Sequence, residues 1–286
     1  MNNILVTGSD GQLGSEIRVL SSQFPQYNFI FTDIDELNLA DADAVDTFFN
    51  SNDVSVCINC AAYTAVDKAE DDRELAMLIN YKAVENLAGV CNTNNSLLIH
   101  ISTDYVFNGR HFKPYEEIDP PAPDSYYGLT KLKGEEAILG LSKNAVIIRT
   151  SWLYSSFGNN FVKTMIRLGN ERDELGVVAD QVGTPTYAAD LAFAIMSIIT
   201  KVENNVIKEI YHYSNEGVIS WYDFAKAIMA HQNIDCKVVA IESKDFPAKA
   251  PRPFYSVLNK AKIKSDFQIE VPYWLDSLNI MISKLR

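Results

Sequence analysis

The sequence predicts an α/β fold, a doubly wound parallel sheet with helices on both faces, followed by a smaller C-terminal domain. Over residues 1–150, apolar runs of strand length alternate with amphipathic segments of helix length, which is the pattern of stacked strand–helix–strand units. The runs are almost continuously apolar, as strands covered by helices on both faces must be. A glycine-rich segment also follows the first run directly, as it does in nucleotide-binding sheets.

Each element is expected in turn along the chain. Strands are expected at residues 4–7, 28–33, 54–59, 96–102 and 145–150, with helices between them at 12–22, 42–50, 68–92 and 126–141. After residue 150 the rhythm changes, and we expect a helix at 161–168, a strand at 176–179 and a buried helix at 188–199. A strand at 210–213 is expected to return to the first sheet. Ser220 and Asp223 form a capping-box pattern that opens a helix ending near His231.

Composition excludes several classes of protein. Among 286 residues, 25 Lys and Arg stand against 37 Asp and Glu, a net charge of −12. An acidic chain without a basic run is not expected to bind nucleic acid. The most apolar run, 191–199, is too short to span a membrane, and the N-terminus does not resemble a signal peptide. Four cysteines are too few for a disulfide framework, so we expect a reducing, cytoplasmic location and no membrane partner.

The glycine loop predicts a dinucleotide site. Gly8, Gly11 and Gly14 lie between the first strand and the first helix, where glycines let the backbone approach a pyrophosphate at the helix N-terminus. Asp33 ends the second strand, in position to accept hydrogen bonds from an adenosine ribose. These features predict a Rossmann-like domain that binds NADPH or NADH. The acid favours NADH, unless an Arg or Lys lies near enough to neutralise a 2′-phosphate.

A second pattern predicts acid–base chemistry. Tyr127 and Lys131 are four residues apart, so their side chains share one helix face, and the ammonium is expected to lower the pKa of the phenol. Ser102 and Thr103 end the preceding strand, at the edge of the sheet where such folds bind ligands. Tyr126 has Thr130 at the same spacing and lacks a cation. The sequence therefore predicts that Tyr127 transfers a proton.

These motifs together resemble the extended short-chain dehydrogenase/reductase family. The resemblance rests on the glycine loop, the Tyr127/Lys131 pair and segments spread over nearly the whole chain: 59–67, 102–107, 149–152, 158–161, 180–186 and 252–253. It implies a catalytic triad of Thr103, Tyr127 and Lys131. It further implies cofactor contacts at Gly8, Gly11, Gln12, Leu13, Gly14, Asp33, Leu39, Ala62, Tyr63, Thr64, Tyr127 and Lys131. Substrate contacts are expected at Val66, Thr103, Asp104, Trp152 and Arg252.

Arg252 is expected among the substrate contacts because of its own position and chemistry. It lies between Pro251 and Pro253, in a conformationally restricted stretch, and its planar fork can bind diphosphate oxygens. The aromatic residues Trp221 and Tyr222 are expected to pack the second lobe, with sugar stacking as the alternative.

The resemblance also implies an activity and a division into domains. The activity is the NAD(P)H-dependent reduction of the C4 ketone of a dTDP-4-dehydro-6-deoxy-L-mannose to dTDP-L-rhamnose, a precursor of polysaccharides. Residues 1–150 and roughly 186–214 would bind the dinucleotide, and residues 151–185 and 215–286 would bind the sugar nucleotide. The alternatives are another nucleotide-sugar reductase, or a non-catalytic subunit resembling the regulatory subunit of methionine adenosyltransferase. A 4,6-dehydratase is disfavoured because Tyr105 stands where such enzymes have a glutamate.

No metal is expected. Some members of the family hold magnesium between two subunits, but the expected second acid is replaced by Ala189, with Asp190 beside it. Cys57 and Cys60 lie three residues apart in a strand and point to opposite faces, so they cannot converge on a metal. A homodimer is one assembly that the resemblance allows.

Overall fold

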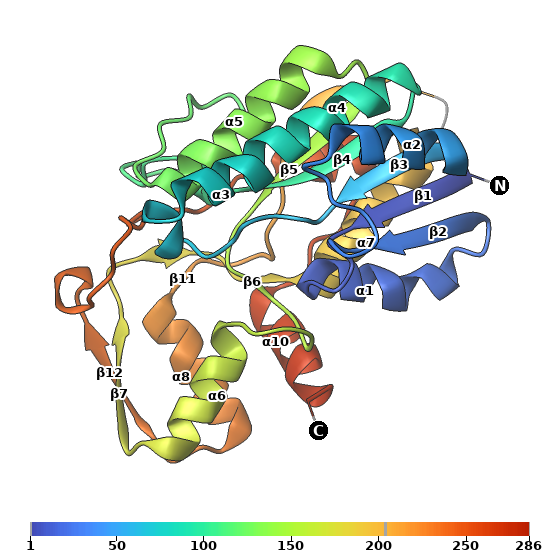
Figure 1. Cartoon of the computed structure of the whole chain (residues 1–286). Coiled ribbons are helices and arrows are strands. Elements are labelled where there is room, and N and C mark those ends of the chain that lie inside the picture. The colour runs from blue at the N-terminus through green and yellow to red at the C-terminus, as the bar shows by residue number, and fades with distance from the viewer. Residues whose placement is uncertain (1, 203–204, 286) are drawn as a thin grey trace.

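The computed structural model describes residues 2–202 and 205–285, and within them the central feature is a six-stranded sheet in the order β10-β5-β4-β3-β1-β2 (Figure 1). All neighbouring strands are parallel. The strand order reverses between β1 and β3, so a ligand crevice is expected where the carboxyl ends of these strands diverge. The predicted doubly wound sheet, including the returning strand, is confirmed. Its strands are β1 (Asn2–Thr7), β2 (Tyr27–Thr32), β3 (Val54–Asn59), β4 (Leu97–Thr103), β5 (Ala145–Thr150) and β10 (Lys208–His212).

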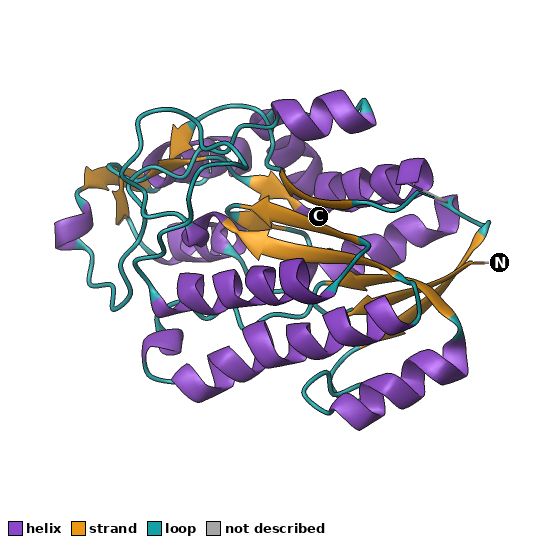
Figure 2. Ribbon diagram, turned by 90° about the horizontal axis from the view of Figure 1, so that it is seen from above, coloured by secondary structure: helices purple, strands orange, loops and turns teal. Residues whose placement is uncertain are grey.

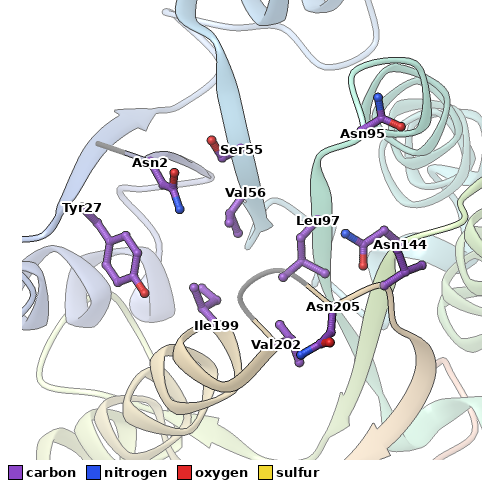
Figure 3. A pocket seen from close by; sticks show the side chains of 11 residues that line it. Asn2, Tyr27, Ser55, Val56, Asn95, Leu97, Asn144, Ile199, Val202 and Asn205 are labelled. Atoms are coloured by element: carbon purple, nitrogen blue, oxygen red, sulfur yellow. The ribbon is translucent and has the colours of Figure 1, made fainter.

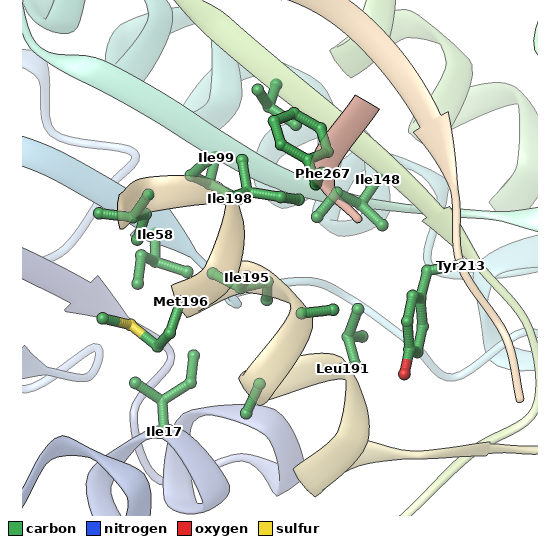
Figure 4. Close-up of a cluster of buried hydrophobic side chains, with 14 of the residues drawn as sticks. Ile17, Ile58, Ile99, Ile148, Leu191, Ile195, Met196, Ile198, Tyr213 and Phe267 are labelled. Carbon is green, nitrogen blue, oxygen red and sulfur yellow. The ribbon is translucent and has the colours of Figure 1, made fainter. Parts of the chain in front are cut away.

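Helices cover both faces of this sheet (Figure 2). On one face α1 (Gln12–Leu20), α7 (Ala188–Val202) and α9 (Ala261–Phe267) pack against Ile4, Val6, Ile58, Ile99 and Ile148 (Figure 4). On the other face α2 (Ala42–Asn52), α4 (Ala83–Thr93) and α5 (Tyr126–Leu141) pack against Leu5, Cys57, Leu98 and Ile147. Successive strand residues thus serve opposite cores, which explains why the strands read as continuous apolar runs.

The later part of the chain builds a smaller lobe beside the carboxyl edge of the sheet. Its core lies between α6 (Phe161–Glu171), α8 (Trp221–Gln232) and α10 (Trp274–Ser283), with β7 (Glu174–Val178) paired in parallel with β12 (Lys237–Ile241). Two short pairs join the lobes, β6 (Leu153–Tyr154) with β9 (Thr186–Tyr187) and β8 (Val182–Gly183) with β11 (Ile219–Ser220). The predicted capping box at Ser220 and Asp223 is confirmed, with reciprocal hydrogen bonds of 3.1 and 2.9 Å.

One predicted helix is wrong in detail. The segment 68–92 is not one regular α-helix: a 3-10 turn (Lys68–Glu70) comes first, and α3 (Arg73–Met77) then leads through a wide π turn, Leu78–Lys82, into α4. The turn places Asn80 in the interior, where its amide bonds both the N–H and the C=O of Tyr63 and the hydroxyl of Thr130 on α5. The wide turn thus lets one side chain connect its own helix to the loop after β3 and to α5, at the edge of the site.

Among the strands and α-helices after residue 150, the sequence did not predict the short strands β6, β8, β9 and β11, nor β12, α9 and α10. Residues of and after α9 (Ile263, Phe267, Ile269, Val271) pack into the sheet core, although the sequence assigns 215–286 to the second domain. The domain boundaries stay a prediction.

Candidate active site

A cleft of about 560 Å³ lies at the carboxyl edge of the sheet, between the two lobes. It is lined by loops that follow β1, β3, β4 and β5, by the first turns of α5, and by Trp221 from the smaller lobe. The predicted site residues that line it are Gly8, Gly11, Gln12, Leu13, Ala62, Thr64, Val66, Thr103, Asp104, Tyr127, Lys131 and Trp152. Segments far apart in the sequence are thus brought together at one place.

The glycine loop has the shape that a pyrophosphate requires. Gly8 has φ +62°, and a Cβ there would come within 2.6 Å of the Ala61 nitrogen. A Cβ on Gly14 would lie 2.5 Å from the Ser9 Cα, so this glycine permits the close packing of loop and helix. Gly11 is the N-cap of α1 and has no side chain to occupy the free N–H groups. The loop therefore offers an open helix N-terminus to an anionic group.

A second cavity of about 470 Å³ continues from the glycine loop along the end of β2. Asp33, Leu37 and Leu39 line it, with Ala62 on the opposite wall. The Asp33 carboxylate accepts hydrogen bonds from the N–H groups of Asp10 and Ile34, at 3.1 and 2.8 Å, and so is tied to the loop. These residues form an apolar slot with one carboxylate at its rim, which fits an adenosine.

A cation also lies beside this slot. Arg18 of α1 donates to the Ser9 hydroxyl at 2.9 Å and lies 3.5 Å from the Asp10 carboxylate. Its guanidinium stacks over the Phe31 ring, 4.3 Å from the centroid. The sequence offered no reason to single out Arg18, because only the packing of α1 against β2 brings it to the loop.

Tyr127 lies at the start of α5 and is 8% exposed. Ser125 caps this helix by accepting from the Gly128 N–H, which places the Tyr127 side chain at the end of β4, and its ring packs edge-on against Tyr105. Burial raises the pKa of Tyr127 to about 12, against the opposing effect of its hydrogen bond with Thr103. The predicted lowering of this pKa by Lys131 is wrong for this structure, because desolvation outweighs the effect of any nearby charge.

Lys131 lies one helical turn further along α5 and is almost fully buried. Its Nζ donates to the Ile101 carbonyl at 2.6 Å and lies 3.3 Å from Nε2 of His100. Burial lowers the pKa of Lys131 to about 8, although Glu135 acts in the opposite direction. His100 was not singled out as a site residue by the sequence; its position two residues before Ser102 on β4 is the signal that could have suggested it.

Asp104 is buried at the floor of the cleft, directly after β4. One of its oxygens accepts from the Thr103 hydroxyl at 3.1 Å, and the other, Oδ2, is buried with no hydrogen-bond partner among the described residues. Burial raises the pKa of Asp104 to about 6. A buried acceptor that lacks a partner and lines a cleft is an apt place for a ligand hydroxyl.

Trp152 and Trp221 form the wall of the cleft on the side of the smaller lobe. Their rings stack with centroids 3.6 Å apart and 14° between planes. Trp152 has φ +49°, a backbone conformation that costs energy in a non-glycine residue and is typical of functional sites. Trp221 packs against the core of the smaller lobe, as expected, and also lines the cleft, where the alternative of sugar stacking stays a prediction.

Arg252 lies outside the main cleft, at a neighbouring cavity of about 450 Å³ in the smaller lobe. Tyr105 and Trp221 line both spaces, so the two are contiguous. The guanidinium of Arg252 binds Asp67 with two hydrogen bonds of 2.8 Å, and Asp67 also accepts from the N–H groups of Lys249 and Ala250. The Arg252 guanidinium holds the pKa of Asp67 at about 2. Arg252 is therefore positioned beside the cleft, on the side of the smaller lobe, but its fork is paired with an acid.

Two predicted cofactor contacts lie elsewhere. Gly14 and Tyr63 are not among the described residues that line the 560 Å³ cleft or the 470 Å³ cavity. Gly14 packs beneath the loop, and the Tyr63 hydroxyl donates to Asp72 at 2.9 Å. In the described part of the chain, no group of three or more His, Cys, Asp or Glu side chains is arranged to hold a metal ion.

A cavity of about 340 Å³ also lies at the opposite, amino edge of the sheet (Figure 3). Val56, Leu97 and Ile199 line it. Parallel sheets of this class bind ligands at the carboxyl edge, so we place the active site in the cleft at that edge. No helix of the described residues is long and apolar enough to cross a membrane.

Comparisons with known proteins agree with this geometry. The family model of the RmlD substrate binding domain matches residues 1–286. The dTDP-4-dehydrorhamnose reductase of Aggregatibacter actinomycetemcomitans is 41% identical over 287 residues, which cover 97% of each chain. The structure of a dTDP-4-dehydrorhamnose reductase from Clostridium acetobutylicum has a TM-score of 0.93 at 42% identity and covers 99% of each chain.

A second solved structure carries a ligand. It is the dTDP-4-dehydrorhamnose reductase of Bacillus anthracis in complex with NADP, which has a TM-score of 0.94 at 38% identity and covers 99% of this chain and 100% of that one. These matches extend over the whole chain and confirm the resemblance that the motifs indicated. The chain belongs to the RmlD family, the family of the dTDP-4-dehydrorhamnose reductases.

Proposed function

We propose that the protein reduces the C4 ketone of dTDP-4-dehydrorhamnose to dTDP-L-rhamnose with NADPH or NADH. The observation that carries this proposal is the meeting of Thr103, Tyr127 and Lys131 with the glycine loop in one cleft. A proton donor, its hydrogen-bond partner and a dinucleotide loop are the parts that a carbonyl reductase requires. The full-length relatives support the substrate.

The residues around the two cofactor cavities fit a nicotinamide dinucleotide. The free N–H groups at Gly11 would hold the pyrophosphate, and the slot between Leu39 and Ala62 would hold the adenine. Asp33 favours a free ribose 2′-hydroxyl, whereas Arg18 nearby offers a partner to a 2′-phosphate. The arrangement supports the use of both NADH and NADPH, and the relative from Bacillus anthracis was solved with NADP.

The acid–base chemistry falls to Tyr127. When bound, the cofactor supplies a hydride to C4 of the sugar. Tyr127 gives its phenolic proton to the O4 oxygen, so the ketone gains one hydride and one proton and becomes an alcohol. Thr103 holds the carbonyl oxygen and the phenol in one hydrogen-bonded group. Lys131 would bind the ribose hydroxyls of the cofactor beside Tyr127. In the same cleft Asp104 and Val66 contact the sugar, and Trp152 and Trp221 form its aromatic wall.

The cavities on either side of the cleft also support a division into two binding domains. We propose that residues 1–150 and roughly 186–214 bind the dinucleotide, and that 151–185 and 215–286 bind the sugar nucleotide, with the dTDP moiety in the cavity beside Arg252. Four free cysteines support a reducing, cytoplasmic location. A homodimer stays a prediction. Light scattering tests it, because a dimer has a mass of about twice the 32.0 kDa of one chain.

The test is the oxidation of NADPH and NADH at 340 nm with enzymatically prepared dTDP-4-dehydrorhamnose. We expect turnover with this substrate and dTDP-L-rhamnose as the product in mass and NMR spectra. Turnover only with a different nucleotide sugar would support another reductase of the same class. Tight cofactor binding with no oxidation of any dTDP-4-keto sugar would support the non-catalytic subunit.

A further inference from the structure

A buried ion pair lies directly behind the edge of the sheet that carries the cleft. Glu135 of α5 is 1% exposed and Arg149 of β5 is 2% exposed. The guanidinium donates from Nε to one carboxylate oxygen at 3.0 Å and from Nη2 to the other at 2.7 Å, so the pair is bidentate. The Ser102 hydroxyl of β4 donates to the same carboxylate. Glu135 thus connects one helix with two neighbouring strands.

The register of the strands puts both partners of Glu135 immediately before the cleft. Ser102 and Arg149 are paired across β4 and β5, so their side chains point to the same face of the sheet. The next pair in this register is Thr103 with Thr150, and both of these residues line the cleft. The carboxylate therefore holds the last residue of each strand before the chain enters the site.

The same helix carries two residues of the site. Tyr127, Lys131 and Glu135 follow one another at intervals of four, so they lie along one face of α5. Tyr127 shares a hydrogen bond with the Thr103 hydroxyl at the end of β4. Lys131 also bonds β4, through the Ile101 carbonyl at 2.6 Å, but it lines the cleft and is proposed to bind the cofactor. Glu135 is an anchor between α5 and β4 that lies behind the cleft.

Stability does not by itself account for this ion pair. Removing two charges from water costs free energy that their attraction repays only in part, and apolar side chains of similar volume often replace such a pair without loss of stability. A bidentate pair instead supplies direction, because it is strong only in one geometry. Arg149 is also held from a second side, since its guanidinium lies 5.0 Å from the ring centroid of Phe107, in the loop after β4.

We propose that Glu135 is a positioning residue for the reduction, which fixes α5 against the ends of β4 and β5. In this role it keeps Tyr127 within reach of Thr103. The inference rests on the proposed function, because the position of the phenol matters only if it gives its proton to a ligand. A displacement of about 1 Å, even one caused far from the reacting atoms, can lower a rate about 100-fold. Loss of the anchor should therefore lower kcat more than it weakens binding.

The test replaces both members of the pair, because removal of Glu135 alone would leave a buried guanidinium without a counter-ion. In the variant with Glu135→Met and Arg149→Met we expect a cooperatively folded protein and a kcat lowered about 10- to 100-fold, with KM for the nucleotide sugar changed less than about threefold. The control is Lys133→Met with Glu136→Met, which removes an exposed ion pair of 2.6 Å from the same helix and should keep the parent kcat. Stopped-flow absorbance at 340 nm measures both.

A conservative variant separates positioning from packing. Glu135→Gln combined with Arg149→Met keeps an amide oxygen that can accept from Ser102, so it should recover part of the lost kcat. A parental kcat in the doubly apolar variant, or an equal loss in the control, would show that the pair only stabilises the fold. If the doubly apolar variant does not fold, the Gln variant is compared with the parent, and a parental kcat there overturns the proposal.

A nuclear Overhauser measurement gives a readout that needs no substrate. The effect between the Thr103 methyl group and the Tyr127 ring, assigned by its loss in Thr103→Ser, reports the contact that Glu135 is proposed to hold. We expect it to weaken in the doubly apolar variant and to persist in the control; an undiminished effect in both would overturn the proposal. If no protein oxidises NADPH with any dTDP-4-keto sugar, the proposed function fails, while this comparison still decides whether Glu135 positions the helix.

Discussion

Tyr127 carries its phenolic proton at neutral pH, because burial raises its pKa to about 12. A protonated phenol is the form that reduction needs, since the proton must pass to the developing alkoxide. The neighbouring Thr103 hydroxyl lies in the same hydrogen-bonded group, and Lys131 is engaged with His100 and Ile101. At the scale of single residues, desolvation therefore sets the protonation of the site more strongly than the spacing of charges along the helix.

The first prediction concerns this phenol. Tyr127→Phe should lower kcat at least about 100-fold while NADPH affinity stays unchanged, because only the proton donor is removed. Tyr126→Phe is the matched control, since its ring lies against Arg73, 4.8 Å from the guanidinium, outside the cleft. Stopped-flow absorbance at 340 nm measures the step. A Tyr127→Phe enzyme with near-normal kcat would rule out the assigned role.

The second prediction concerns pH and Asp104. The unfolded chain releases this proton near pH 3.8 and the folded protein near pH 6, so the unfolded state binds fewer protons between those values. Stability conferred by this group therefore falls as pH rises through that window. Asp104→Asn lacks this titrating group. Its free energy of unfolding, relative to that of the parent, should therefore rise by up to about 3 kcal/mol between pH 4 and pH 7. Urea unfolding at both pH values measures it; a difference independent of pH would contradict it.

The third prediction concerns the choice of cofactor. Asp33→Ala should weaken NADH binding by about 1 to 2 kcal/mol, through the loss of a charge-assisted hydrogen bond to the ribose, and affect NADPH less. Asp35→Ala, at an exposed position of the same loop, is the control. Fluorescence titration gives both dissociation constants. Equal weakening of both cofactors would mean that Asp33 acts only through its hydrogen bonds to the loop.

At the scale of elements, periodicity predicted the sheet and its helices well, because each strand is covered on both faces and each helix has one apolar face. The π turn at Leu78–Lys82 could not be predicted, since its apolar pattern is nearly that of an α-helix. The π turn differs from a regular α-helix in that it directs Asn80 to partners in the loop after β3 and on α5. Local sequence does not contain them.

The fourth prediction concerns that turn. Asn80→Ala removes three hydrogen bonds, one buried and two part-buried, and leaves both backbone polar groups of Tyr63 without this partner, so it should destabilise the fold by about 2 to 4 kcal/mol. Asn50→Ala, on the exposed side of α2, should change stability by less than about 0.5 kcal/mol. Thermal unfolding compares the two. Similar melting temperatures would show that the wide turn does not depend on Asn80.

At the scale of the whole molecule, the site depends on contacts between the two lobes. The sequence predicted the residues of the sheet edge, because motifs at strand ends converge in any parallel sheet. It could not show that Trp221 stacks on Trp152, or that Asp67 binds Arg252, because both pairs join segments far apart in the chain. What only the structure reveals is therefore how the side chains of the two lobes pair with one another across the cleft.

The last prediction concerns the Arg252–Asp67 pair. Arg252 lies at the cavity beside the cleft, so Arg252→Ala should raise KM for the nucleotide sugar about 10- to 100-fold while NADPH affinity stays unchanged. Arg252→Lys should restore only part of the lost affinity for the nucleotide sugar, because an ammonium lacks the planar fork. Asp67→Ala separates two roles of the acid. If Asp67 holds the fork in place, this variant raises KM as well, and the double variant adds little. If Asp67 competes with the diphosphate for the same fork, KM falls. A wild-type KM in Arg252→Ala would place the diphosphate on other groups of the smaller lobe.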